Sequence, residues 1–408
     1  MMAGQCEAAG FAVVPPGEAS DVVVAQSCAV TAAAEGEAFR LIRKLRRRMP
    51  SPFIVVTGCV TSLHDAERFR REGADLVVAQ KEKEHLANSI TSVFFPPSHG
   101  GGKNTDVILK PTSRFFTTRG SVKVQDGCDF RCAYCIVPDT RGSAVSRPLA
   151  DIVVDAEAVA RSHREIVLTG VNVATYHHQE VTLVDMIRRV LVIPELGRLR
   201  LSSLEPGFVE REIAELMARE PRLCRMLHYP LQSGDDGVLR AMRRRYTVAE
   251  YCDALEYIVG VVPAIGLGTD IITGFPGETD EAFENTKRIL ERYPFSNIHV
   301  FPYSERPGTP AATFAGSVPV AVRRERAAVL SVLAEEKRRA FAQSWVGKPV
   351  EVLIERHGGG VSRGWTSEYL EASILGKLPI GELVTFTPTA DENGICGGGQ
   401  GRGGVVLS

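Results

Sequence analysis

The sequence DGCDFRCAYCIVP, residues 126–138, places three cysteines at the spacing C-x3-C-x2-C. Cys128, Cys132 and Cys135 cannot all pair with one another as disulfides, because their number is odd. A structural zinc site is the less favoured alternative, since no second pair of ligands with zinc spacing lies nearby. Three thiolates on one short loop suit a [4Fe–4S] cluster, and they leave one iron open for another ligand.

Strand-like and helix-like segments alternate from this loop onward. The expected strands are residues 121–125, 165–172, 198–203, 226–232, 267–275 and 297–304. The expected helices between them are residues 148–162, 181–192, 208–219, 247–260 and 279–292. This alternation predicts an α/β fold with a parallel sheet and right-handed crossovers. Six units are too few for a closed eight-stranded barrel, and the cysteine loop lies at the carboxyl end of the first strand, where such folds carry their chemistry.

The first hundred residues show the same alternation on a smaller scale. Expected strands at 21–25, 53–58 and 74–79, with helices between and after them, predict a doubly wound, flavodoxin-like domain over residues 1–98. Cys28 and Cys59 each follow a strand, and parallel pairing would bring both to one edge of the sheet.

Three further segments complete the chain. Residues 99–113 are predicted to be a linker, and residues 114–345 contain the barrel and a charged final helix at 319–345. Short strands separated by glycines predict a small β-barrel over residues 346–408.

The cysteine motif, with Tyr134 before its last cysteine, resembles the signature of the radical S-adenosylmethionine (SAM) superfamily. The resemblance implies that Cys128, Cys132 and Cys135 hold a [4Fe–4S] cluster whose open iron binds SAM. Reductive cleavage of SAM would yield a 5′-deoxyadenosyl radical that abstracts hydrogen from the substrate. The resemblance also implies an open (β/α)6 partial TIM barrel.

Longer blocks resemble the methylthiotransferases, radical SAM enzymes that insert a methylthio group into tRNA bases or one ribosomal protein. The blocks are VVVAQSCAVTAAAE, IVVTGCV, VQDGCDFRCAYCIVPDTRGSAVSRP, EIVLTGVN, LRLSSLEP, HYPLQSGDDGVLRAMRRRYT, DIITGFPGET and FPYSERPGTPA. The resemblance implies that residues 346–408 are a TRAM- or OB-like RNA-binding domain. It also implies a second [4Fe–4S] cluster held by Cys28, Cys59 and one further cysteine. Cys28 and Cys59 match the second and third of the family's three cysteines. Cys6 lies some fourteen residues beyond the position expected for the first, about 20 Å along a helix, so we expect it to be a helix residue. The first strand and one cluster ligand are therefore expected to be missing, through a late start codon or a genuinely incomplete cluster.

Other residues are assigned to SAM or substrate contact by the same resemblance. They are Tyr134, Gly170, Glu205, Gln232 and Asp270. Each of the last four has a plainer interpretation, as a strand end, a solvated loop residue or the polar side of a strand. No catalytic side chain is expected beyond the cluster ligands.

The tail indicates the substrate. RGWTSEYLEA, residues 363–372, resembles the branch that modifies N6-threonylcarbamoyladenosine beside the tRNA anticodon. The resemblance implies conversion of this nucleoside at tRNA position 37 to its 2-methylthio derivative. One SAM would donate a methyl group to sulfur at the N-terminal cluster, and a second would generate the radical that activates carbon 2 of the base. The alternatives are another tRNA base, a ribosomal protein, another radical SAM reaction, or a truncated paralogue that binds RNA without methylthiolation.

The expected partners are the tRNA anticodon stem-loop and an electron donor such as flavodoxin or ferredoxin, with the chain itself a monomer. Residues 346–408 carry five Lys+Arg against seven Asp+Glu, whereas RNA-binding modules are usually basic. RNA contact would therefore depend on Trp365, Tyr369 and basic runs such as Arg243–Arg245 and Arg43–Arg48, which could equally face solvent.

The composition and charge of the chain limit the classes of protein to which it can belong. The 408 residues contain 48 Lys+Arg against 49 Asp+Glu, which argues against a protein that coats nucleic acid or membrane. No apolar run reaches the length of about 20 residues needed to span a bilayer, and the opening MMAGQCEAAGFAVV lacks the features of a signal peptide. A cytoplasmic location is expected, where disulfides are rare. Cys6, Cys224, Cys252 and Cys396 receive no functional role.

Overall fold

The computed structural model describes residues 2–95, 117–391, 394–397 and 405–407, and their contacts divide the chain into two units. The N-terminal unit comprises Met1–Phe116, Gly127–Ala144 and Ser304–Ala312. The barrel unit comprises Thr117–Asp126, Val145–Tyr303 and Thr313–Ser408. The cysteine loop thus belongs with the N-terminal residues, and the tail belongs with the barrel. The predicted linker, residues 99–113, lies outside the described residues.

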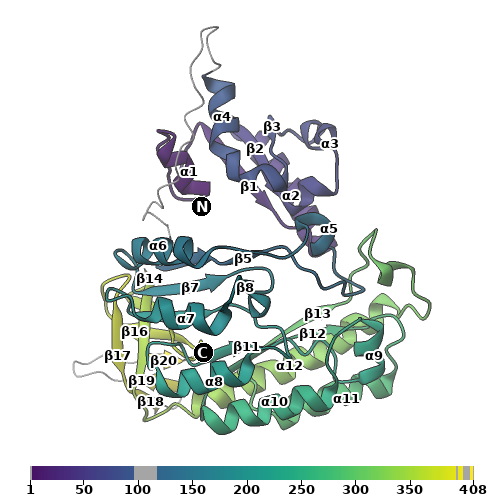
Figure 1. Ribbon diagram of the computed structural model, residues 1–408, viewed down its shortest axis with the longest axis vertical. Helices are drawn as coiled ribbons and strands as arrows, with labels where there is room; N and C mark the ends of the chain where they lie inside the picture. Colours follow the sequence, from purple (N-terminus) through teal and green to yellow (C-terminus); the bar gives the residue numbers. More distant parts are fainter. Residues whose placement is uncertain (1, 96–116, 392–393, 398–404, 408) are drawn as a thin grey trace. The chain divides into compact units, whose positions relative to one another are not determined.

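The sheet of the N-terminal unit is parallel, in the order β1-β2-β3 (Figure 1). Its strands are β1 (Val22–Ser27), β2 (Phe53–Gly58) and β3 (Leu76–Val77), and its helices are α1 (Met2–Ala8), α2 (Ala32–Arg46), α3 (Ala66–Arg71), α4 (Leu86–Phe94) and α5 (Val137–Arg141). Alternate residues of β2 enter two apolar layers, because successive strand side chains point to opposite faces. Ile54 packs with α2 and α3, and Val55 packs with α1 and α4. Helices on both faces confirm the doubly wound prediction.

Six parallel strands form the barrel, in two sheets ordered β10-β7-β4 and β11-β12-β13. The strands are β4 (Arg119–Lys123), β7 (Glu165–Thr169), β10 (Arg198–Leu201), β11 (Met226–His228), β12 (Gly266–Thr273) and β13 (Asn297–Pro302). A parallel bridge between Leu199 and Leu223 connects the two sheets. Each predicted strand is present, which confirms the (β/α)6 barrel.

Helices lie along the outside of these strands (Figure 1). They are α6 (Leu149–Ala160), α7 (Leu183–Leu191), α8 (Glu210–Arg219), α9 (Asp236–Ala241), α10 (Val248–Val261), α11 (Asp280–Arg292) and α12 (Val320–Gln343). Threonine sets the start of three of them, since Thr182, Thr247 and Thr279 accept a hydrogen bond from the backbone of the first turn. Two short antiparallel pairs, β5 (Gln125–Asp126) with β6 (Val145–Ser146) and β8 (His177–His178) with β9 (Val181–Thr182), complete the barrel.

The tail is a curled antiparallel sheet in the order β17-β14-β15-β16-β20-β19-β18. Its strands are β14 (Val350–Gly358), β15 (Val361–Thr366), β16 (Glu371–Leu375), β17 (Leu383–Phe386), β18 (Pro388–Asp391), β19 (Gly394–Gly397) and β20 (Val405–Leu407). Phe341, near the end of α12, and Trp345, just after it, pack into the apolar core of the tail sheet. This helix therefore ties the tail to the barrel.

A buried ionic network joins the tail to the amino ends of the barrel strands. Glu165, the first residue of β7, accepts hydrogen bonds from Arg198 at 2.5 Å and Arg200 at 2.7 Å. The two guanidinium groups also donate to tail carbonyls of Glu351 and residues 365–367. Burial raises the pKa of Glu165, but the two arginines outweigh it and lower that pKa overall. The tail thus lies at the end of the barrel opposite to the carboxyl ends of the strands.

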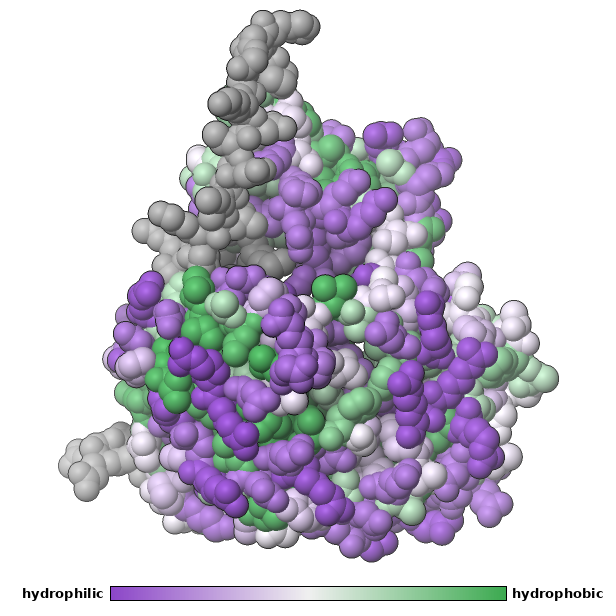
Figure 2. Space-filling model, in the orientation of Figure 1, coloured by the Kyte–Doolittle hydropathy of each residue, from purple (hydrophilic) through white to green (hydrophobic). Residues whose placement is uncertain are grey.

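The surface carries both polar and apolar areas. Figure 2 shows apolar surface over α6 and α7 and hydrophilic surface over much of the remaining face of the barrel unit. Val154 on α6 and Val192 at the end of α7 are 58% and 60% exposed. Among the described residues, no helix is both long and apolar enough to cross a membrane.

Candidate functional site

The cysteine loop leaves the barrel unit through β5 and returns through β6, which pair as a two-stranded ribbon. Gly127 opens the loop with φ of 71°, and a Cβ there would lie 1.9 Å from the carbonyl oxygen of Ser143. Only glycine fits such a position. The N–H of Cys128 donates to the carbonyl of Gly142 at 3.1 Å, so both ends of the loop are held together.

None of the three cysteines of this loop forms a disulfide among the described residues. Cys132 is buried, whereas Cys128 and Cys135 are half-buried. The N–H of Phe130 donates to the sulfur of Cys128 at 3.4 Å, and Cys132 and Cys135 share a tight backbone turn. Three thiols on one loop, free of disulfides and backed by an N–H donor, form a donor set that fits an iron–sulfur cluster.

Cys28 and Cys59 follow neighbouring strands, as predicted. Ser27 at the end of β1 pairs with Gly58 at the end of β2, so the two cysteines come next in register. Gly58 has φ of 105°, and a Cβ there would lie 2.2 Å from the carbonyl oxygen of Ser27. The close approach of the two strand ends therefore requires glycine before Cys59. Cys28 is exposed and Cys59 is buried.

Cys6 does not join this pair. It lies in α1 and packs with Val55 and α4 in one apolar layer, whereas Cys59 belongs to the other. Burial raises the pKa of the Cys6 thiol. The structure confirms the prediction that Cys6 is a helix residue.

The cysteine loop packs directly on the loop that carries Cys59. Ile136, next to Cys135, belongs to the same apolar layer as Cys59. The Nε of Arg141 donates to the sulfur of Cys59 at 3.2 Å, and Ser62 donates to the carbonyl of Thr140 at 3.3 Å. The loops that carry the two sets of cysteines, far apart in sequence, therefore pack against each other within one unit.

The segment Ser304–Ala312 supports this arrangement. The N–H of Ala311 donates to the carbonyl of Ala133 in the cysteine loop at 2.8 Å. Arg306, whose side chain is 3% exposed, donates to Glu35 of α2 at 2.8 Å, and His64 bonds the same carboxylate at 2.6 Å. Burial raises the pKa of Glu35, but these hydrogen bonds outweigh it and lower that pKa.

In the barrel unit, Gly170 follows β7 and lies against β5. A Cβ at Gly170 would lie 3.0 Å from the carbonyl oxygen of Gln125. The side-chain oxygen of Gln125 accepts from the N–H groups of Val171 and Asn172, both at 3.0 Å. Gln125, which the sequence did not mark, thus fixes the TGVN turn, and the contact of Gly170 with SAM stays a prediction.

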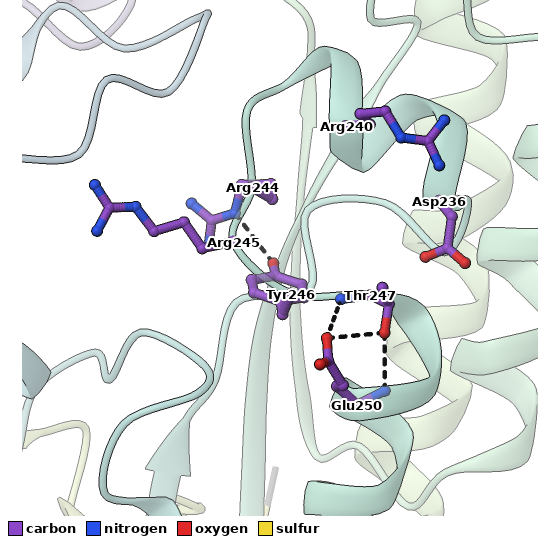
Figure 3. Close-up of a pocket in the computed structure, with 7 residues that line it drawn as sticks. All are labelled: Asp236, Arg240, Arg244, Arg245, Tyr246, Thr247 and Glu250. Carbon is purple, nitrogen blue, oxygen red and sulfur yellow. Dashed lines mark hydrogen bonds between the residues drawn. The ribbon is translucent and has the colours of Figure 1, made fainter.

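Glu205 forms an ion pair with Arg244, whose side chain is 3% exposed. Burial raises the pKa of Glu205 despite this partner. Arg244 also donates to Tyr246, and both line a pocket of about 340 Å³ with Arg240, Arg245 and two carboxylates (Figure 3). Figure 3 shows Arg244 turned toward Tyr246 and Arg245 extending away from Glu250. The basic triplet therefore divides, with Arg244 inside and Arg243 and Arg245 exposed.

Gln232 and Asp270 lie side by side where β11 ends. The N–H of Gln232 donates to the carbonyl of Asp270 at 2.8 Å, and its own carbonyl accepts from Ile272. Gln232 has φ of 66°, a strained value for a residue with a side chain and one that favours a functional position. The carboxylate of Asp270 contacts His228 at 3.1 Å and His299 at 3.2 Å. Burial raises the pKa of Asp270, but the two histidines outweigh it and hold that pKa well below its usual range.

Comparison with known proteins identifies the family. Residues 122–290 match the radical SAM superfamily, and residues 1–79 match the uncharacterized protein family UPF0004. The threonylcarbamoyladenosine tRNA methylthiotransferase MtaB of Thermotoga maritima is 35% identical over 395 residues, which cover 94% of this chain and 89% of that protein. The chain belongs to the radical SAM methylthiotransferase family.

Other relatives of this methylthiotransferase differ in the substrate that their names give. The MtaB of Bacillus subtilis is 30% identical, over 90% of this chain and 85% of that protein. The tRNA-2-methylthio-N(6)-dimethylallyladenosine synthase of Novosphingobium aromaticivorans is 34% identical, over 94% and 90%. Overall identity therefore does not separate the two substrates.

Solved structures confirm the fold of the methylthiotransferase chain. The radical SAM methyltransferase TsrM of Kitasatospora setae superimposes with a TM-score of 0.55 at 17% identity. The match covers 72% of this chain and 64% of that chain. Membership of the superfamily implies a [4Fe–4S] cluster and SAM, and the three cysteines Cys128, Cys132 and Cys135, which form no disulfide, fit that cluster.

Proposed function

We propose that this methylthiotransferase converts N6-threonylcarbamoyladenosine at tRNA position 37 to its 2-methylthio derivative. The names of the Thermotoga maritima and Bacillus subtilis relatives support this substrate. The GWTSEYLEA block of the tail supports it as well. The cytoplasmic location, the monomeric state and a flavodoxin or ferredoxin electron donor belong to the same proposal.

The observation that carries the proposal is the packing of the two cysteine loops in one unit. Insertion of a methylthio group needs hydrogen abstraction and a sulfur source close together. The contact of Ile136 with the Cys59 layer and the Arg141–Cys59 hydrogen bond support this proximity. A radical SAM enzyme that only abstracts hydrogen has no need of the N-terminal cysteines.

Within this proposal, Cys128, Cys132 and Cys135 hold a [4Fe–4S] cluster, and Cys28 and Cys59 contribute to a second one. The first cluster, with SAM bound, supplies one-electron cleavage of SAM and hydrogen abstraction. Arg141 positions Cys59 by its N–H···S hydrogen bond, and N–H donors to cluster sulfur also tune reduction potential. Gly127 and Gly58 allow the two loops to take these paths.

Residues of the barrel unit bind and orient in the proposal. Gln125 holds the TGVN turn, so that Gly170 and the backbone beside it keep one conformation. Glu205, Gln232 and Asp270, together with Tyr134 of the cysteine loop, contact SAM or the nucleoside. Glu205 is held by Arg244, and Asp270 by two histidines, so neither carboxylate has to be ordered when a ligand arrives.

In this proposal, exposed arginines of the barrel, and not the aromatic rings of the tail, contact the RNA. Trp365 and Tyr369 stack on each other with centroids 4.5 Å apart, and the guanidinium of Arg200 lies 5.2 Å from the centre of the Tyr369 ring. These rings therefore serve the junction between tail and barrel. Arg240, Arg243 and Arg245 are exposed near the carboxyl end of β11 and suit contact with phosphate.

The proposal is tested with anticodon stem-loop oligonucleotides that carry threonylcarbamoyladenosine, dimethylallyladenosine or unmodified adenosine at position 37. Anaerobically reconstituted protein, SAM and a reductant are added, and the nucleosides are analysed by mass spectrometry. The expected product is the 2-methylthio form of the first oligonucleotide alone. Methylthiolation of the dimethylallyl oligonucleotide instead would assign the chain to the other substrate. The Cys128/Cys132/Cys135 triple-Ala variant serves as the inactive control.

A further inference from the structure

Three neighbouring strands bring a cluster of polar and aromatic side chains to one face. In the parallel register, His228 pairs with Gly268, Asp270 with His299, and Ile272 with Phe301. Residues in register on adjacent parallel strands project to the same side of the sheet. These six residues therefore share one face of the barrel wall.

That face is the inner one. The intervening residues of β12 point the other way, toward the helices. Thr269 contacts the hydroxyl of Tyr251 on α10, and Thr273 donates to the carbonyl of Arg323 on α12. Because the helices cover the outside, the cluster faces the interior of the barrel.

Asp270 is the centre of the cluster. Its low pKa makes it an ionised carboxylate, which can only accept hydrogen bonds. His228 through Nε2 and His299 through Nδ1 are therefore the donors. The His228 ring lies over Gly268, where a Cβ would come within 2.6 Å of Nδ1, so glycine makes room for it.

His299 and Phe301 are the members open to a ligand. The side chain of His299 is 48% exposed, whereas that of His228 is 13% exposed. Phe301 is 44% exposed, and its ring meets the His299 ring with centroids 6.3 Å apart. With Nδ1 bound to Asp270, His299 presents Nε2, which accepts a hydrogen bond when the ring is neutral and donates one when it is protonated. An exposed phenylalanine beside it offers a face on which a base can stack.

We propose that His299, oriented by Asp270 and backed by His228, binds the hydroxyl or carboxylate of the threonyl arm of the modified adenosine, while Phe301 stacks on a base. This inference rests on the proposed function. Threonine carries a hydroxyl and a carboxylate, which match the two states of Nε2. A dimethylallyl arm carries neither, so it would cover Nε2 of His299 without giving it a hydrogen-bond partner. Buried polar groups left unpaired are a strong basis for rejecting such an analogue.

The test measures binding of the three stem-loops to wild-type protein and to H299L by fluorescence anisotropy. Wild-type protein is expected to prefer the threonylcarbamoyl stem-loop over the unmodified one. H299L is expected to lose that preference by a factor on the order of tenfold to a hundredfold, with unchanged affinity for the unmodified stem-loop. D270N, which removes the carboxylate with little change of shape, is expected to lose preference in the same direction. F301A should weaken binding of all three stem-loops alike.

H177L, at an exposed histidine of β8 in the same unit, is the matched control and should keep the wild-type preference. Full preference retained in both H299L and D270N would overturn the inference. A wild-type protein that fails to methylthiolate the threonylcarbamoyl stem-loop would overturn the proposed function and the subsite with it. The wild-type assay alone identifies that second case.

Discussion

Glu165 offers the sharpest test of how the tail is held. Its side chain is 0% exposed, and its partners Arg198 and Arg200 are 2% and 3% exposed. Substitution by Gln removes the only carboxylate in contact with both guanidinium groups in the described structure. Breaking a buried ion pair by removing one partner costs about 3–5 kcal/mol. Each arginine keeps carbonyl acceptors in the tail, so we expect the lower end, about 3 kcal/mol, for E165Q.

The assay is urea unfolding under anaerobic conditions, followed by tryptophan fluorescence. The chain has two tryptophans, and both report on the tail, since Trp345 lies in its core and Trp365 lies on β15. With a denaturant slope of about 2–3 kcal/mol per molar, the midpoint should fall by about 1–1.5 M urea.

The matched control is E351Q. Glu351 approaches the same Arg198 at 3.7 Å, but its side chain is 46% exposed. Exposed pairs contribute about 0–1 kcal/mol, so E351Q should leave the midpoint almost unchanged. If E165Q shifted the midpoint no more than E351Q does, the buried network would not be what holds the tail to the barrel.

Further predictions concern the cluster sites and acid stability. The Cys128/Cys132/Cys135 triple-Ala variant should lose about four irons per chain on reconstitution, and an iron content equal to wild type would contradict the assigned ligands. C6A should keep the wild-type iron content, because Cys6 packs in the layer remote from Cys59; a loss of iron would make Cys6 a ligand. G58A should destabilise the N-terminal unit by more than about 1 kcal/mol, since its Cβ would meet the Ser27 carbonyl at a strained φ; unchanged thermal unfolding would refute the steric argument. The lowered pKa of Glu165 adds stability that is present above the unfolded value of about 4.3 and is lost as pH falls through the folded pKa. The difference in the free energy of unfolding between wild type and E165Q should therefore become smaller as the pH falls. A difference that does not change with pH would contradict the lowered pKa of Glu165.

Regular elements were predictable because local pattern determines them. Each of the six barrel strands and five crossover helices was expected within a few residues, and Cys6 was correctly placed in a helix. The short α9 was not expected, because Asp236–Ala241 is too brief to show helical periodicity.

The site was predictable only in part. The C-x3-C-x2-C spacing alone indicates a cluster site at Cys128, Cys132 and Cys135. The order of the parallel strands predicts that Cys28 and Cys59 lie close together. His299 carries no such signal, since one histidine on a strand is indistinguishable from a solvated residue until Asp270 is found in register with it. The same holds for Arg141, which reaches Cys59 across 82 positions of sequence.

The sequence predicted that the tail contacts RNA through Trp365 and Tyr369. In the structure these two rings stack on each other, and the guanidinium of Arg200 lies against the Tyr369 ring. Arg198 and Arg200 lie in a strand segment that reads as alternating apolar and basic, a pattern typical of a solvated face. Only the long-range contact with residues 365–367 shows that both are buried. Such non-local burial is not recorded in local sequence.

Nucleoside mass spectrometry of tRNA from a deletion strain tests the central claim most directly. The account predicts that 2-methylthio-N6-threonylcarbamoyladenosine disappears, that its unmethylthiolated precursor accumulates, and that the wild-type gene, but not a C59A gene, restores the product. An unchanged amount of the methylthiolated nucleoside in the deletion strain would contradict it.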